Sequence, residues 1–60
     1  MAGTFQVYED RAGRFRWRLK TSAGLVVATG EAYSTKQQAR LACGSVQRAC
    51  DGAKIELVDG

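Results

Sequence analysis

The sequence predicts an α+β domain in which one helix packs on a small antiparallel sheet, in the order β-β-β-α-β. Three observations support this: segments of alternating polar and apolar residues are separated by glycine turns, a capping motif then opens a stretch with small apolar residues at helical spacing, and alternation returns near the end. The whole chain, 1–60, is expected to form a single domain. The expected elements are strands over 3–10, 14–21 and 25–30, a helix over 34–50 and a last strand over 53–58.

The first two strands are expected to form a hairpin. A three-residue loop ending at Gly13, with that glycine in the left-handed conformation, pairs Asp10 with Arg14. In this register each apolar residue faces another apolar residue, and a shift by one position would set Val7 against arginine. The resulting cross-strand pairs are Tyr8 with Arg16, Val7 with Trp17, Gln6 with Arg18 and Phe5 with Leu19.

The third strand is apolar on both faces. Strict alternation sets Leu25 and Val27 on one face and Val26 and Ala28 on the other. One of these pairs cannot lie in the intramolecular core, so something must cover part of the outer face of the sheet. Val26 and Ala28, together with Leu41, are therefore candidate residues of a dimer interface.

The helix begins with a capping-box pattern, in which Ser34 is the expected N-cap and Gln37 reaches back to it. It is expected to end near Gly52. Leu41 falls outside the apolar stripe and should be exposed, whereas Trp17 should be a core anchor beneath the small residues of the helix. That stripe consists of Thr35, Ala39, Ala42, Cys43, Val46 and Cys50.

The composition excludes most hydrolase mechanisms. The chain has nine Lys or Arg, six Asp or Glu, a net charge of +3 and no His, which is the commonest general base and metal ligand. No enzymatic activity, metal or cofactor is therefore expected. Cys43 and Cys50 lie two helical turns apart, about 10 Å along the axis and beyond the ~7 Å between Cα atoms that a disulfide can bridge. Both are expected to be small buried apolar residues.

Length points to association. A 60-residue chain buries only ~60% of the surface that its unfolded form exposes, so a solitary core is marginal without a disulfide, a metal or a second subunit. No apolar run approaches the ~20 residues that span a bilayer, and the N-terminus lacks the pattern of a signal peptide. The protein is expected to be cytoplasmic, with no membrane partner.

Residues in a fixed order and spacing run through nearly the whole chain: Phe5–Tyr8, Gly13, Arg16–Lys20, Gly24, Ala28–Thr29, Glu31–Lys36, Ala39 and Ser45–Val46. This pattern resembles the YegP-like family of small bacterial and archaeal domains, which occur as single copies or tandem repeats and whose function is uncharacterised. The resemblance implies three strands, a helix and a fourth strand, and for a single-copy member a homodimer that mimics the tandem repeat. The chain has Ala23 where the family usually has Asn. The family supplies no established active residues to carry over.

One face of the second strand is cationic. Arg14, Arg16, Arg18 and Lys20 follow one another at ~6.6 Å, close to the phosphate spacing of a nucleic-acid strand, and Tyr8 beside Arg16 offers a stacking surface. These residues are a candidate nucleic-acid or anion site. The alternative is architectural, because long Arg stems cover apolar surface in a dimer interface or on a solvated sheet face.

The start of the helix offers a second candidate anion site. Lys36 in the first turn runs against the usual preference for acidic residues there. It could hold an anion together with Thr35 and backbone amides, or form a salt bridge with Glu31. The salt bridge is favoured because Ser34 already occupies the cap.

The leading functional hypothesis is a homodimeric binding or structural interaction module without catalytic activity, whose partner is a second copy of itself. The alternative is a weak nucleic-acid or anion-binding protein that uses the basic sheet face. Ionic strength separates the two, because binding to phosphates weakens steeply with salt and association through apolar area does not.

Overall fold

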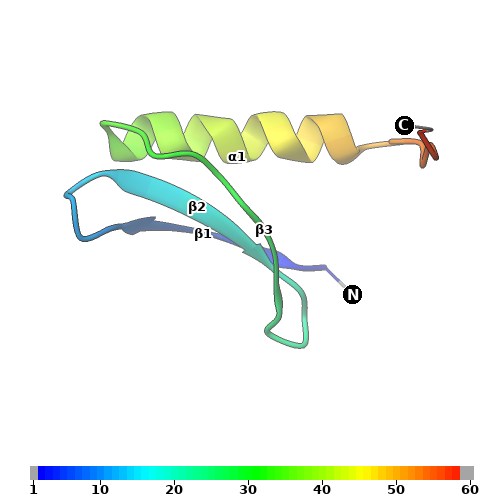
Figure 1. Cartoon of the computed structure of the whole chain (residues 1–60), viewed down its shortest axis with the longest axis horizontal. Helices are drawn as coiled ribbons and strands as arrows, with labels where there is room; N and C mark the ends of the chain where they lie inside the picture. The colour runs from blue at the N-terminus through cyan, green and yellow to red at the C-terminus, as the bar shows by residue number, and fades with distance from the viewer. Residues whose placement is uncertain (1, 59–60) are drawn as a thin grey trace.

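A computed structural model describes residues 2–58 and shows a three-stranded antiparallel sheet with one helix packed across it (Figure 1). The sheet order is β1-β2-β3. The predicted α+β class is confirmed, and the ends of these elements lie within two residues of the predicted bounds. The elements are β1 (Thr4–Glu9), β2 (Phe15–Lys20), β3 (Val26–Thr29) and α1 (Lys36–Cys50).

The first hairpin forms as predicted. Gly13 has a φ of 79°, and the Asp10 backbone N–H donates to the Arg14 carbonyl at 2.8 Å. The Asp10 carboxylate Oδ1 also accepts from the backbone N–H groups of Ala12 and Arg14, each at 3.0 Å. These bonds close the loop in one register, and all four predicted cross-strand pairs between β1 and β2 are confirmed.

The pairing of β2 with β3 is irregular. Leu19 faces Ala28, but the next residue, Lys20, faces Val26, so the register shifts between them. Residues directly opposite each other in an antiparallel pair lie on the same face, and Leu19 and Lys20 lie on opposite faces. Ala28 therefore lies on the inner face and Val26 on the outer one. The prediction that they share a face is wrong, because a bulge interrupts the alternation on which it was based.

The N-cap of the helix lies one residue later than predicted. Thr35 is the N-cap: its backbone is extended, with φ −130° and ψ 152°, and its Oγ1 accepts from the Gln38 backbone N–H at 3.1 Å. Ser34, the predicted cap, instead donates from Oγ to the Gln38 side-chain oxygen at 3.0 Å. Both positions begin a Ser/Thr-x-x-Gln pattern. A two-way backbone bridge between Tyr33 and Phe15 holds the chain against the sheet just before them, and the helix begins from the second position.

The core is small and centred on Trp17, as predicted. Trp17 is 7% exposed, and its ring meets that of Phe5 edge-on, with centroids 5.6 Å apart and planes at 63°. Above it, α1 contributes two buried small residues, Ala39 and Cys43. Because these side chains are small, the helix lies close enough to the sheet for the indole to fill the layer between them.

The two cysteines differ in environment. Both thiols are free, but Cys43 is buried and Cys50 is exposed. The prediction of burial is thus right for Cys43 and wrong for Cys50. Cys50 is the last residue of α1, beyond the part of the helix that covers Trp17.

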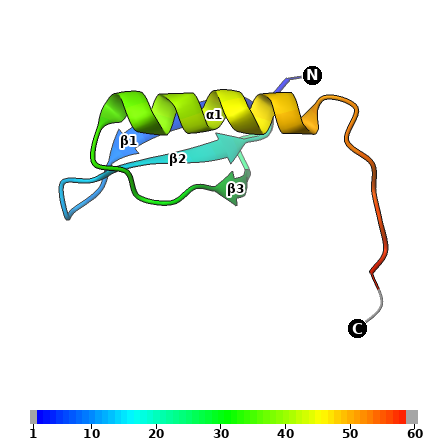
Figure 2. The same ribbon diagram turned by 90° about the horizontal axis from the view of Figure 1, so that it is seen from above.

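The predicted last strand does not form within the single chain. Residues 53–58 belong to no strand, and Ile55, Leu57 and Val58 are 96%, 97% and 86% exposed. Gly52, with a φ of 71°, turns the backbone at the helix end, and the segment then runs away from the sheet (Figure 2). The prediction of a strand over 53–58 is therefore wrong for one chain, because the segment lies beside no strand edge with which its backbone could pair.

Candidate association surface and basic sheet face

Apart from Leu41, the large exposed apolar side chains lie on two segments, β3 with its preceding turn and the stretch after α1. Leu25, Val26 and Val27 are 65%, 49% and 59% exposed. Among the described residues, α1 contacts β1 and β2 but not β3. The helix therefore does not cover the edge of the sheet that β3 forms. We call these two sets of exposed residues, Leu25–Val27 and Ile55, Leu57 and Val58, the association surface.

The predicted interface residues do not form one patch. Val26 is exposed in β3, whereas Ala28 is half-buried on the opposite face of the same strand. Leu41 is 62% exposed, as predicted, but it lies half-way round the helix from the buried Ala39 and Cys43 and so faces away from the sheet. Only Val26 belongs to the association surface.

The basic sheet face is assembled largely as predicted. Arg16, Arg18 and Lys20 alternate along β2 with residues that face the helix, and Tyr8 of β1 lies opposite Arg16. Every residue directly across from these three cations is uncharged, on β1 and on β3 alike. Arg14 precedes β2 and is exposed beside the hairpin loop. The three cations of β2 therefore have no acidic residue directly across from them, whereas Arg14 lies across the hairpin from Asp10.

Arg18 is held in place by two neighbours. Its Nε donates to the Gln6 side-chain oxygen at 2.8 Å, and its guanidinium carbon lies 4.6 Å from the centre of the Tyr8 ring. The stack therefore joins Tyr8 to its diagonal neighbour rather than to Arg16, which lies directly across from it. The guanidinium covers one face of the ring, so that face is not open to a nucleic-acid base.

Lys36 is separate from the basic sheet face. It is the first residue of α1, and the helix packs on the inner side of the sheet, opposite the cationic side chains. Near it, Thr35 already accepts the backbone N–H of Gln38. The structure thus does not unite the predicted cations into one site.

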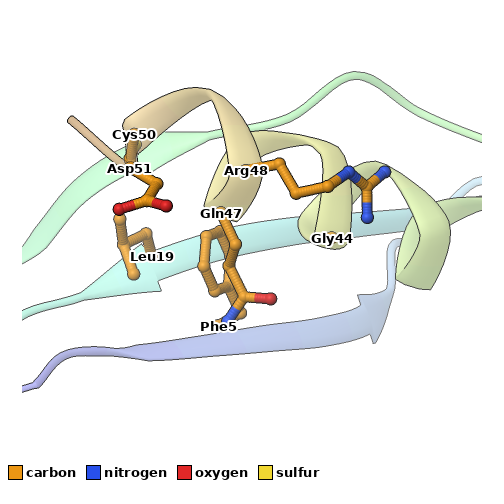
Figure 3. A pocket seen from close by; sticks show the side chains of 7 residues that line it. All are labelled: Phe5, Leu19, Gly44, Gln47, Arg48, Cys50 and Asp51. Carbon is orange, nitrogen blue, oxygen red and sulfur yellow. The ribbon is translucent and has the colours of Figure 1, made fainter. Parts of the chain in front are cut away.

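Sequence reasoning missed a hollow between the second half of α1 and the sheet. It has a volume of about 600 Å³ (Figure 3). Gly44 on the helix is the only sequence signal, because a missing side chain there leaves room. Phe5 and Leu19 form the sheet side, and the helix side and helix end supply Gly44, Gln47, Arg48, Cys50 and Asp51.

Two observations concern metal binding and thiol reactivity. Across residues 2–58 no three His, Cys, Asp or Glu side chains gather where they could hold a metal ion. Burial raises the pKa of the Cys43 thiol, which disfavours the thiolate that a nucleophile needs. Over the same range, no helix is long and apolar enough to cross a bilayer.

Comparison with known proteins places the chain in a family. A UPF0339 protein of Treponema denticola is 43% identical over 58 residues, which cover 95% of this chain and 100% of that protein. A UPF0339 protein encoded in the 5′ region of the ptx operon of Stutzerimonas stutzeri is 40% identical over 93% of this chain, which spans only 51% of that relative. The NMR solution structure of a Haloferax volcanii protein superimposes with a TM-score of 0.79 at 34% identity, covering 95% of this chain and 97% of that one.

The family profile described as "Domain of unknown function (DUF1508)" matches residues 10–56, which include the cationic strand, α1 and most of the segment after it. The resemblance to the YegP-like family is thereby confirmed. With this match and the similarity to UPF0339 proteins along nearly its full length, the chain belongs to the DUF1508 family.

Proposed function

We propose that this chain is a small, non-catalytic interaction module that works as a homodimer. One observation carries the proposal: Ile55, Leu57 and Val58 are 86–97% exposed, while Trp17, Ala39 and Cys43 are the only buried side chains within residues 2–58. An apolar segment of this kind is normally covered, and the core of a domain of this size is marginal by itself. A second copy would cover the segment and add buried apolar area.

Sedimentation equilibrium tests the proposal directly. We expect twice the 6.5 kDa chain mass at both low and high salt, because apolar association is not screened by ions. A single-chain mass throughout the concentration range would contradict it.

A second candidate function is the binding of a nucleic-acid strand by the basic sheet face. The specific observation in its favour is that Arg16, Arg18 and Lys20 each lie across from uncharged residues. Positive charge left without acidic neighbours is free to pair with phosphates.

Fluorescence anisotropy with a short single-stranded oligonucleotide tests this second candidate. Binding should weaken as salt rises, and Arg16→Gln with Lys20→Gln should lower the slope of log affinity against log salt by about 0.7 for each phosphate that the variant no longer neutralises. Lys36→Gln on the opposite layer is the matched control and should leave the slope unchanged. Two results would rule out the basic sheet face as the site: no binding at low salt, or a Lys36→Gln control that lowers the slope as much as the variant with Arg16→Gln and Lys20→Gln.

A further inference from the structure

We propose that Arg18 is the phosphate anchor of the basic sheet face, and that Gln6 and Tyr8 are positioning residues that hold its guanidinium ready for a single-stranded nucleic acid. This inference rests on the second candidate function above. It deepens that function by naming the residue that binds the nucleic-acid backbone most firmly and by giving two uncharged neighbours a part in the affinity.

Arg18 is the one cation of β2 that is held by side chains of a neighbouring strand within residues 2–58. Its Nε donates to the side-chain oxygen of Gln6 at 2.8 Å, and Gln6 lies directly across from it in the β1–β2 register. The ring centre of Tyr8, its diagonal neighbour, lies 4.6 Å from the guanidinium carbon. Because these two contacts orient the guanidinium, the entropy of ordering this long side chain is lost on folding rather than on binding.

The hydrogen bond to Gln6 leaves the far end of the guanidinium for a ligand. Arginine carries five N–H donors, and this bond uses only the one on Nε. The four donors on the two terminal amino groups form the planar fork that binds two phosphate oxygens at once. The residues directly across from Arg18 are Gln6 and Thr29, so no acidic side chain in either of these positions competes for the fork.

Arg16 and Lys20 extend the anchor in both directions along β2. Each lies two residues from Arg18 on the same face of the strand, about 6.6 Å away, which is close to the distance between neighbouring phosphates of a nucleic-acid strand. Figure 1 shows α1 on one side of the sheet only, the side opposite these cations. A single strand can follow a straight row of cations on such a face, whereas the backbones of a duplex coil away from it. We therefore expect single strands to bind more tightly than a duplex.

Phosphate contact also agrees with the position of Tyr8. Bases stack on open aromatic faces, but the Arg18 guanidinium lies over one face of this ring. The ring therefore contributes by orienting the cation rather than by stacking that face on a base. Because contacts to phosphates carry no sequence information, binding should not depend on base sequence.

Charge-conserving variants of the intact chain test the anchor. Fluorescence anisotropy measures the binding of a short labelled oligothymidylate over a range of salt concentrations. Arg18→Lys keeps the charge but removes the planar fork, so affinity should fall on the order of tenfold with an unchanged salt slope. Arg16→Lys is the matched control: it lies on the same strand and face but is not held by Gln6, and it should lose no more than about twofold.

Two further variants test the positioning residues. Tyr8→Leu and Gln6→Leu each release Arg18 without changing a charge, so affinity should fall about twofold to tenfold while the salt slope stays the same. Thr4→Val changes another uncharged position of β1, across from Lys20, and should bind like the unmodified chain. An unchanged circular dichroism spectrum shows that each variant is folded.

The outcomes separate this inference from the function on which it rests. If the unmodified chain does not bind the oligothymidylate at low salt, nucleic-acid binding by the basic sheet face fails. If it binds, but Arg18→Lys loses no more affinity than Arg16→Lys, the basic sheet face stands and the anchor fails. If Tyr8→Leu and Gln6→Leu bind as tightly as Thr4→Val, the positioning roles fail. Equal affinity for the oligothymidylate and for a duplex of the same length would overturn the assignment to single strands.

Discussion

At the scale of single residues, Gly30 leaves less room for a side chain than any other described glycine, because it lies against the Trp17 indole. A Cβ built at Gly30 would overlap the indole Nε1, Cε2 and Cδ1 atoms, and the Gly30 backbone N–H donates to the Trp17 carbonyl at 2.9 Å. The absence of a side chain at this position is therefore what lets the chain after β3 cross the buried ring. The requirement is steric, since Gly30 does not have a positive φ.

Gly30→Ala should lower the free energy of unfolding by about 1–3 kcal/mol, because the methyl group forces the indole or the backbone to move. Urea denaturation followed by Trp17 fluorescence measures this. Gly44→Ala is the matched control: its Cβ would meet only the flexible end of Arg48 at 3.4 Å, so the gain in helix propensity should raise stability by about 0.5–1 kcal/mol. Equal effects of both substitutions would show that the Trp17 contact is not the cause.

The two thiols should react at very different rates. Cys50 is exposed, whereas Cys43 is buried and its thiol pKa is raised by that burial, so Cys43 is both inaccessible and protonated. Titration with a thiol reagent at neutral pH should modify one cysteine per native chain quickly and the second only after denaturant is added. The Cys50→Ser variant should show no fast phase. A fast phase of two thiols per chain would mean that the packing over Trp17 opens readily.

At the scale of elements, the helix depends on its N-cap. Thr35→Ala removes the acceptor of the Gln38 backbone N–H and should lower the free energy of unfolding by about 1 kcal/mol, near the middle of the range for cap residues. Ser34→Ala, which removes only an exposed side-chain contact, should cost less than half of that. The urea midpoints of the two variants compare these losses directly. A larger loss of stability in Ser34→Ala than in Thr35→Ala would mean that Ser34 is the N-cap after all.

Some elements could be predicted from sequence because local chemistry fixes them. The β1–β2 register follows from the Gly13 turn and the pairing of apolar residues, both of which are local. The register shift between Leu19 and Lys20 could not be predicted, since nothing in the alternation marks a bulge. The N-cap was ambiguous because two successive positions fit one motif, and a tertiary contact, the Tyr33–Phe15 bridge, lies just before them.

The candidate sites were also predictable only where local sequence determines them. Alternation along β2 put Arg16, Arg18 and Lys20 on one face correctly, but it could not show that Arg18 stacks diagonally on Tyr8. The last strand shows the limit most clearly. Its residues have a strand pattern, yet a strand forms only where another strand edge is available, and sequence alone does not say which chain supplies that edge.

At the scale of the whole molecule, the stability of the fold should depend on the association of two copies. If the folded form is a dimer, unfolding releases two chains, so mass action makes the thermal midpoint rise with protein concentration. A tenfold increase should raise it by roughly 5 °C, given about 2.1 cal/mol/K of unfolding entropy per residue and about 1.4 kcal/mol per tenfold concentration change. Differential scanning calorimetry measures the midpoint. The variant with Ile55→Asp and Leu57→Asp should unfold at a lower temperature that does not depend on concentration, whereas Leu41→Asp should keep the dependence. A concentration-independent midpoint for the unmodified chain would mean that one copy is stable alone with its apolar C-terminal segment in water.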